Sequence, residues 1–361
     1  MPSGRWVGSI LGGSREASPP WVLTLSREAV ITVADLGEFG LIAQIRALVP
    51  PEPDGVLGIG DDAAVLPAPG GRTVVSTDLL VEGRHFRRDW SSAADVGVKA
   101  AAQNLSDIAA MGAAPTALLL GLAVPGDTAV AWVLELAAGL LAECQRAGAV
   151  LAGGDVTSAD SVMLGITAVG DLAGRPAVTR SGARPGDVVA VSGVPGRSAA
   201  GLALLEAGLD PAEGELADLV AAHRRPQPDY AAGISAAFAG ATSMIDVSDG
   251  LVADLGHVAA ASGACVDIHQ ASLANQSLEA AAAVLRADWR TWALSGGEDH
   301  ILAASFPSHA GVPQAWTVIG HVREGSGVLV DSQLFHGRGG WDHFSAKLRS
   351  SSVDSFRGRE S

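Results

Sequence analysis

Apolar runs of strand length alternate with alanine-rich helical stretches along most of this chain, and no other sequence feature limits its fold as strongly. The strand-like runs are rich in Val, Leu and Ile, whereas the helical stretches repeat apolar residues every three or four positions. The predicted helices span 37–49, 93–111 and 129–148, and the predicted strands span 55–68, 72–83, 116–125, 149–158 and 162–172. This alternation is typical of a sheet covered by helices, so we expect an α/β or α+β fold.

A second unit of mixed strands and helices follows the first. The segment DVVAVSG (187–193) is a predicted strand, and VPGRSAAGLALLEAG (194–208) is a predicted glycine-rich turn with a helix after it. With 361 residues, the chain is long enough for an N-terminal sheet-plus-helices domain and a C-terminal α/β domain. The predicted boundaries are 1–33 for a disordered leader, 34–173 and 174–346 for the two domains, and 347–361 for a frayed tail.

The charge and the cysteines exclude several classes of partner. A net charge of −15 argues against nucleic acid, because nucleic-acid binding needs a basic face. No apolar run reaches the roughly 18 residues that span a bilayer, so no membrane partner is expected. The two cysteines, Cys144 and Cys265, lie far apart in apolar surroundings, which is typical of buried thiols in a reducing compartment. Together with the lack of a signal-peptide pattern, they indicate a cytoplasmic protein.

Acidic residues recur at the ends of the apolar segments, usually beside Gly, Ser or Thr. The first case is LGIGDDAAVL (57–66), in which Asp61 and Asp62 are adjacent. The later cases are Asp78, Asp107, Asp155, Asp246, Asp249, Glu298 and Asp299. One such residue is typical of a turn or a helix cap, but this repetition in a chain with 17% charged residues favours a shared site. Converging carboxylates need cations to neutralise them, and Mg²⁺ held by carboxylates and substrate phosphates fits the pattern.

No common nucleotide-binding motif accompanies these carboxylates. The sequence lacks both G-x-x-x-x-G-K-[ST] and the protein-kinase motifs. The segment GVPGRSAAG (193–201) is the nearest match to a phosphate-binding loop, because it leads into the N-terminus of a predicted helix. It has no lysine, however, and a tight strand-to-helix turn is an equally good interpretation.

Nine sequence blocks in a fixed order give the chain a specific resemblance. Between Gly37 and Phe344 they read GEFGLIAQI, GIGDDAAVL, STDLLVEGRHF, NLSDIAAMGA, GGDVTS, TRSGARPGD, IDVSDGL, SGGED and GWDHF. In these blocks the chain closely resembles thiamine-monophosphate kinase, within the superfamily of aminoimidazole ribonucleotide synthetase and selenophosphate synthetase. The first and last blocks favour the thiamine branch. One departure follows SGGED, where His300 and Ile301 replace the usual aromatic and acidic residues.

The resemblance implies a two-domain synthetase-like fold, a homodimer, and ATP-dependent phosphorylation of thiamine monophosphate to thiamine diphosphate with several Mg²⁺ ions. The Mg²⁺ ligands that it implies are Asp62, Ser76, Thr77, Asp78, Asp107, Asp155, Asp246 and Asp249. The ATP contacts that it implies are Gly154, Asp155, Arg180 and Ser248. The contacts to thiamine monophosphate that it implies are His85, Glu298 and Trp341.

The chemistry of these residue types agrees with most of the implied roles. Arg180 can pair with a polyphosphate through its planar fork of donors, and Trp341 offers a flat face to a cationic ring. Without the resemblance, His85 is an ordinary surface or core histidine, Glu298 a turn carboxylate, and Trp341 equally well a packed aromatic. The acceptor phosphate has a second pKa of about 6, so its oxygen is already a nucleophile at pH 7. A metal-assisted transfer therefore needs no general base.

Two other functions fit the acidic pattern. Another enzyme of the superfamily would activate a carbonyl or a selenide with ATP. A selenophosphate synthetase is expected to carry a reactive Cys near its N-terminus, whereas no Cys precedes Cys144 here. A non-enzymatic module for divalent ions would bind cations without turning over a nucleotide.

Overall fold

The computed structural model describes residues 31–51, 71–307, 311–335, 337, 339 and 340. The predicted strand 55–68 and the predicted tail lie outside these residues, as does nearly all of the predicted leader. Three residues singled out in the sequence, Asp61, Asp62 and Trp341, also lie outside them.

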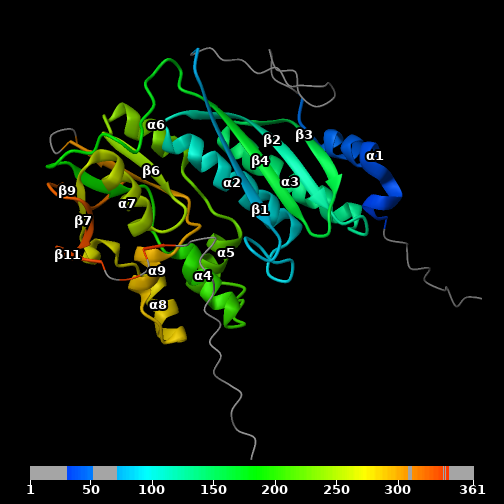
Figure 1. Ribbon diagram of the computed structural model, residues 1–361. Helices are drawn as coiled ribbons and strands as arrows, with labels where there is room; N and C mark the ends of the chain where they lie inside the picture. The colour runs from blue at the N-terminus through cyan, green and yellow to red at the C-terminus, as the bar shows by residue number, and fades with distance from the viewer. Residues whose placement is uncertain (1–30, 52–70, 308–310, 336, 338, 341–361) are drawn as a thin grey trace, which may run out of the picture. The chain divides into compact units, whose positions relative to one another are not determined.

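A four-stranded mixed sheet forms the first half of the described chain (Figure 1). Its strands are β1 (Thr73–Val81), β2 (Ala114–Val124), β3 (Val150–Ser158) and β4 (Met163–Asp171). They lie in the order β1-β4-β2-β3, in which β4 is antiparallel to both of its neighbours and β2 is parallel to β3. The strands predicted from the apolar runs between 72 and 172 are thereby confirmed.

Three helices accompany this sheet, namely α1 (Val33–Leu48), α2 (Ala93–Ala110) and α3 (Val130–Ala147). The first two begin with capping boxes, Thr32 with Asp35 and Ser92 with Asp95, in which each side chain accepts the other residue's backbone N–H. α3 has no such cap and ends at Gly148, which adopts the left-handed conformation at φ 76°. The three helices predicted in this half are thus present.

α2 and α3 pack unusually closely because glycines face the partner helix. A Cβ atom at Gly97 would lie 2.0 Å from the carbonyl oxygen of Leu136. A Cβ atom at Gly139 would lie 2.2 Å from the carbonyl oxygen of Ala94. Larger residues at these positions would force the helices apart, and the close pair covers one face of the sheet (Figure 1).

A seven-stranded, mostly antiparallel sheet forms the second half, in the order β11-β10-β7-β9-β5-β8-β6. Its strands are β5 (Val188–Val191), β6 (Ser243–Val247), β7 (Cys265–Ile268), β8 (Ile301–Phe306), β9 (Thr317–Arg323), β10 (Gly327–Val330) and β11 (Gln333–Leu334). The helices are α4 (Arg197–Glu206), α5 (Glu215–Arg224), α6 (Tyr230–Phe238), α7 (Leu251–Ser262), α8 (Gln276–Leu285), α9 (Trp289–Ser295) and the 3₁₀ turn η1 (Gln270–Leu273). The α/β fold class expected from the sequence is confirmed.

The apolar core of the first half continues into the second half. It combines α1 to α3 and the first sheet with residues of the second half such as Tyr230, Met244, Leu302 and Phe306. A separate core fills the space around β5 to β7 and the helices α4, α5, α7 and α8. As a result α2 packs against the first sheet and also against β6, β8 and α6. The domain boundary at 173/174 stays a prediction.

The face of the first sheet that turns away from α2 is left uncovered by the described residues. Along β1 the side chains alternate, with Leu80 fully buried while Val75 and Leu79 are 61% and 59% exposed. Met163 on β4 is exposed as well.

Within the described part of the chain, no helix is long and apolar enough to cross a membrane.

Candidate active site

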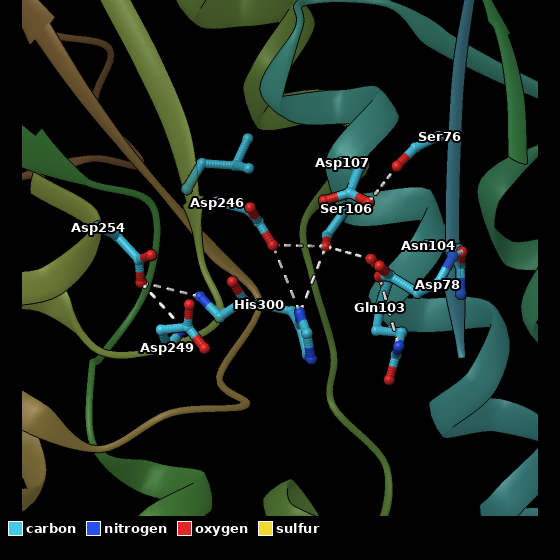
Figure 2. A network of polar contacts seen from close by, with 12 residues as sticks. Ser76, Asp78, Gln103, Asn104, Ser106, Asp107, Asp246, Asp249, Asp254 and His300 are labelled. Atoms are coloured by element: carbon cyan, nitrogen blue, oxygen red, sulfur yellow. Dashed lines mark hydrogen bonds and ion pairs between the residues drawn. The ribbon is translucent and has the colours of Figure 1, made fainter. Parts of the chain in front are cut away.

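Polar side chains of α2 meet the middle of β1. The hydroxyl of Ser76 donates a 2.6 Å hydrogen bond to Oδ2 of Asp107. The backbone N–H of Asp78 donates to Oδ1 of Asn104 at 3.0 Å, and Nε2 of Gln103 lies 3.4 Å from Oδ2 of Asp78. Figure 2 shows these side chains in the space between β1 and α2. The structure therefore brings together three residues that the sequence proposes as metal ligands.

Asp246 joins this group from the second sheet, near the C-terminal end of β6. Its Oδ2 lies 3.2 Å from the hydroxyl of Ser106 on α2 and 3.5 Å from Nδ1 of His300 (Figure 2). All three residues are buried. His300 directly precedes β8 and has a positive φ of 54°, which is rare for a residue with a side chain. The departure from the family pattern at position 300 therefore lies inside the site.

Burial and neighbouring charges disfavour the ionisation of Asp78 and Asp107. Burial, together with the neighbouring charges of Asp246 and Asp78, raises the pKa of Asp107 to about 7, against the hydrogen bond from Ser76. Burial also raises the pKa of Asp78, with Asp246 adding to the effect and His300 opposing it. Burial by itself lowers the pKa of His300, but its hydrogen bond to Asp246 and that residue's charge outweigh burial and raise it. A cation bound beside these carboxylates would relieve their repulsion.

The oxygen donors of this group suit a hard divalent cation. Mg²⁺ needs only one or two protein carboxylates when waters and substrate phosphates supply its other ligands. Within the described residues, no three His, Cys, Asp or Glu side chains form a metal-binding group on their own. The geometry therefore fits an ion shared with a phosphate better than a closed structural site.

A buried carboxylate organises the loop between β6 and α7. Oδ2 of Asp254 accepts the backbone N–H groups of Ser248, Asp249 and Gly250 at 3.1, 3.1 and 3.0 Å (Figure 2). Burial raises the pKa of Asp254 to about 7, against these hydrogen bonds. Ser248 and Asp249, which the sequence proposes as an ATP contact and a metal ligand, are half-buried on this loop. Asp254 thus fixes their backbone.

Glu298 lies in the loop between α9 and β8 and is tied to three other segments. Its backbone N–H donates to the carbonyl of Ser248 at 2.7 Å, and its φ is positive at 65°. Its carboxylate accepts a hydrogen bond from Nζ of the buried Lys99 at 3.1 Å and lies 3.4 Å from Nδ1 of His223. Burial raises the pKa of Glu298, but the charge of Lys99 outweighs it and the pKa is lowered. This carboxylate is held in its ionised form.

The glycine-rich turn before α4 is filled by a side chain of the chain itself. The backbone N–H groups of Gly196 and Ser198 donate to the carboxylate of Asp299 at 2.5 and 2.8 Å. Gly196 has a φ of 92°, and a Cβ atom there would lie 2.6 Å from the backbone of Trp292. Because Asp299 occupies this helix N-terminus, the strand-to-helix turn is the better interpretation of GVPGRSAAG.

The remaining described residues of the predicted site lie apart from the carboxylate group. Thr77 points to the uncovered face of β1, where its hydroxyl donates to the carbonyl of Ile166 at 2.8 Å. Asp155 lies on β3 at the opposite edge of the sheet, about three strand spacings or roughly 14 Å from β1. Gly154 must be a glycine, because a Cβ atom there would lie 2.0 Å from the carbonyl oxygen of Leu120.

Two further predicted contacts come from loops. Nδ1 of His85 accepts the backbone N–H of Val81 at 3.0 Å, which leaves Nε2 to carry the proton of the neutral imidazole. Arg180 is exposed in the segment between the two sheets, and its carbonyl accepts a hydrogen bond from Ser262 at 3.2 Å. Arg180 lies on an exposed segment, whereas the charge of His85 acts on Asp78 and opposes the rise of the Asp78 pKa.

Several residues of the site are absent from the sequence-based set. They are Lys99, Asn104, Ser106, His223 and Asp254. Three of them follow helical spacing with Asp107 or with one another on α2, so the periodicity of that helix is the signal that could have pointed to them. His223 and Asp254 carry no comparable signal.

The chain resembles several characterised proteins over most of its length. The family model described as AIR synthase related protein, N-terminal domain, matches residues 60–172. Thiamine-monophosphate kinase of Mycobacterium tuberculosis is 48% identical over 316 residues, which cover 87% of this chain and 93% of that protein. The crystal structure of thiamine-monophosphate kinase from Stenotrophomonas maltophilia is 35% identical, with a TM-score of 0.74 over 82% of this chain and 98% of that one. A structure described as AaThiL complexed with AMPPCP and TMP is 34% identical, with a TM-score of 0.72 over 87% and 99%.

Proposed function

Because the chain belongs to the thiamine-monophosphate kinase family, we propose that it transfers the γ-phosphoryl group of ATP to thiamine monophosphate and so makes thiamine diphosphate. The structural observation that carries this proposal is the meeting of Asp78, Asp107 and Asp246 from β1, α2 and β6. Carboxylates gathered in this way can bind the metal ions that a polyphosphate substrate brings with it.

Magnesium is part of this proposal. Ser76, Asp78, Asp107 and Asp246 would hold Mg²⁺ on the described part of the site, and Asp249 would hold a further ion. Asp62 belongs to the same proposed set, although it lies outside the described residues. Bound Mg²⁺ would neutralise the charge of the phosphate groups during transfer.

The protein residues would then align two anions, the phosphate of thiamine monophosphate and the γ-phosphate of ATP. The acceptor phosphate of thiamine monophosphate has a second pKa of about 6, so its oxygen is a nucleophile without a general base. What remains is to bring that oxygen in line with the γ-phosphorus and to exclude water. The buried position of Asp246 and Ser106, on elements from both halves of the chain, suits a site that excludes water.

The substrate contacts are proposed as the sequence implies them. Gly154, Asp155, Arg180 and Ser248 would contact ATP. His85 would donate from Nε2 to the phosphate of thiamine monophosphate, because its Nδ1 is occupied by the Val81 N–H. Glu298 would face the cationic thiazolium or the aminopyrimidine, and Trp341 would stack on a ring.

A homodimer is proposed from the uncovered face of the first sheet. Val75, Leu79 and Met163 expose apolar surface there, which a second copy of the chain could bury. Thr77 and Asp155 lie on the same face as Leu79, by the alternation and register of the strands. A second copy would therefore place its own residues beside two proposed ligands that this chain alone leaves apart.

Two other sequence predictions remain proposals of the same kind. A two-domain division near residue 173 agrees with the place where the chain passes from the first sheet to the second. A cytoplasmic location agrees with Cys144 and Cys265, which are both buried and free.

The direct test is a product assay with ATP, Mg²⁺ and one of three acceptors. We expect thiamine diphosphate and ADP in equal amounts with thiamine monophosphate, and neither product with thiamine or without an acceptor. ADP release that is independent of thiamine monophosphate would favour another enzyme of the superfamily. Cation binding without nucleotide turnover would favour a binding module.

A further inference from the structure

A lysine side chain is fully buried next to the site. Lys99 lies on α2 with only 2% of its side chain exposed, and it is among the largest fully buried side chains in the described residues. Lysine is almost never buried without a partner, because an unpaired ammonium group loses its hydration. Its position therefore requires a specific interaction.

That interaction is with Glu298, which is 199 residues away in the sequence. Nζ of Lys99 donates to Oε2 of Glu298 at 3.1 Å and to the carbonyl oxygen of His223 at 3.2 Å. Nδ1 of His223 lies 3.4 Å from the same Oε2. Burial and the charge of Lys99 lower the pKa of His223 to about 3, so the imidazole is neutral at pH 7 and Lys99 supplies the positive charge.

Exposure of the two partners is unequal. Glu298 keeps 30% of its side chain exposed, whereas Lys99 keeps 2%. A ligand can therefore contact the Glu298 side chain, whereas the ammonium group of Lys99 is shielded from it. Lys99 and His223 both lie against Oε2 of Glu298, so a ligand would bind through Oε1.

α2 connects this ion pair to the group around Asp107. Lys99, Gln103 and Ser106 follow at intervals of four and three residues, so they share one face of the helix. Gln103 contacts Asp78, and Ser106 contacts Asp246. The same helix face thus positions both the carboxylates proposed for Mg²⁺ and the carboxylate proposed for the substrate.

We propose that Lys99 is a positioning residue for substrate recognition, which fixes the orientation and the charge of Glu298 for the cationic part of thiamine monophosphate. Lys99 acts from behind the carboxylate and does not itself contact the substrate. This inference rests on the proposed function, because it requires Glu298 to contact the substrate.

The test compares four variants by their KM and kcat for both substrates and by calorimetric binding of thiamine monophosphate. Lys99→Met removes the charge at similar volume, Glu298→Gln removes the carboxylate, and the double variant removes both. Arg146→Met is the matched control, because Arg146 pairs with the buried Glu143 on α3 away from the site. We expect Lys99→Met to raise KM and Kd for thiamine monophosphate by about tenfold or more and to leave KM for ATP within about twofold.

The double variant decides whether Lys99 acts through Glu298. If it does, Lys99→Met adds nothing to Glu298→Gln, and the double variant binds thiamine monophosphate within about twofold of Glu298→Gln. Arg146→Met should lower the Tm without changing either KM. If Lys99→Met does not fold, the cause is the carboxylate of Glu298, which has lost its cation. The double variant lacks this carboxylate, and comparing it with Glu298→Gln still shows whether Lys99 acts through Glu298.

Three outcomes would overturn the inference. Normal binding by Lys99→Met, while Glu298→Gln binds poorly, would refute the role of Lys99 alone. Losses that multiply in the double variant would show that Lys99 acts independently of Glu298. Normal binding by Glu298→Gln would refute the substrate contact itself, whereas turnover of thiamine monophosphate by the wild type tests the proposed function separately.

Discussion

Ser106 on α2 lies 3.2 Å from Asp246 on β6, and this contact joins the two halves of the chain at the group of carboxylates. Ser106 belongs to the helix that covers the first sheet, and Asp246 to an edge strand of the second sheet. The site therefore depends on α2 packing against β6 and β8 as well as against β1. Changes that disturb this packing or the loops beside it should affect catalysis more than they affect folding.

The loop between β6 and α7 offers one such change. Asp254→Ala removes the acceptor of three backbone N–H groups, so we expect the free energy of unfolding to fall by about 1–3 kcal/mol. We also expect KM for ATP to rise by roughly tenfold, because Ser248 and Asp249 lose their fixed backbone. Asp229→Ala is the control, since Asp229 caps α6 through two backbone N–H groups. Asp229→Ala should lower the free energy of unfolding and leave KM for ATP unchanged. If Asp254→Ala and Asp229→Ala had the same KM for ATP, this role of Asp254 would be refuted.

Buried His223 makes the stability of the protein depend on pH. Its pKa is lowered from 6.5 to about 3 in the folded state, mainly by burial, so the unfolded chain binds a proton that the folded chain refuses. Stability is therefore lost as the pH falls below 6.5, by about 1.4 kcal/mol per pH unit and about 2 kcal/mol at about pH 5.

Urea unfolding of the wild type and of His223→Gln, with EDTA at about pH 7.5 and about pH 5, isolates this effect. The acidic groups that titrate in the same range are common to both proteins, so only the difference between them matters. We expect His223→Gln to gain about 2 kcal/mol relative to the wild type on acidification. A difference in unfolding free energy that does not change with pH would contradict the neutral state of His223.

If the uncovered face of the first sheet forms the dimer interface, a charged residue on that face should prevent dimer formation. Leu79→Asp places a carboxylate at a position that is 59% exposed in a single chain, so folding should survive. We expect light scattering to give twice the chain mass for the wild type and the single chain mass for the variant. Phe238→Asp, at an exposed residue of the second half, should leave the mass unchanged. A monomeric wild type would refute the dimer.

The sequence predicts the first sheet well and the second half poorly. The strands between 72 and 172 carry strong apolar runs, whereas α5, α6, α8 and β9 to β11 form from short segments whose pattern is weak. Their placement depends on the core around β5 to β7, which brings distant segments together. Local periodicity does not encode such contacts.

The same distinction applies to the site. Ser76 and Asp78 share one face of β1, and Thr77 takes the other, as the alternation of side chains along a strand requires. That separation was available from the sequence. Helix periodicity places Lys99 on the same face of α2 as Ser106, but it does not reveal the contact of Lys99 with Glu298, 199 residues away. His223 carries no such signal, because its contact with Glu298 spans 75 residues of chain.

The central claim is that Asp78, Asp107 and Asp246 serve catalysis through bound Mg²⁺. Asp246→Asn and Asp107→Asn each remove one charge and keep the size of the side chain. Because the charges of Asp246 and Asp78 raise the pKa of Asp107, removing one of these charges relieves repulsion, and the Tm of the metal-free variants should be unchanged or higher. The kcat should fall by about 100-fold or more, since the phosphoryl group loses its metal-borne charge neutralisation.

The most direct measurement is kcat of Asp246→Asn and of the wild type across a Mg²⁺ titration, with the Tm of both proteins recorded in EDTA. We predict that the variant has a normal or raised Tm, a collapsed kcat at low Mg²⁺, and partial recovery at high Mg²⁺, because weakened metal affinity responds to concentration. A lowered Tm together with wild-type kcat at every Mg²⁺ concentration would contradict the metal site and make Asp246 a structural residue.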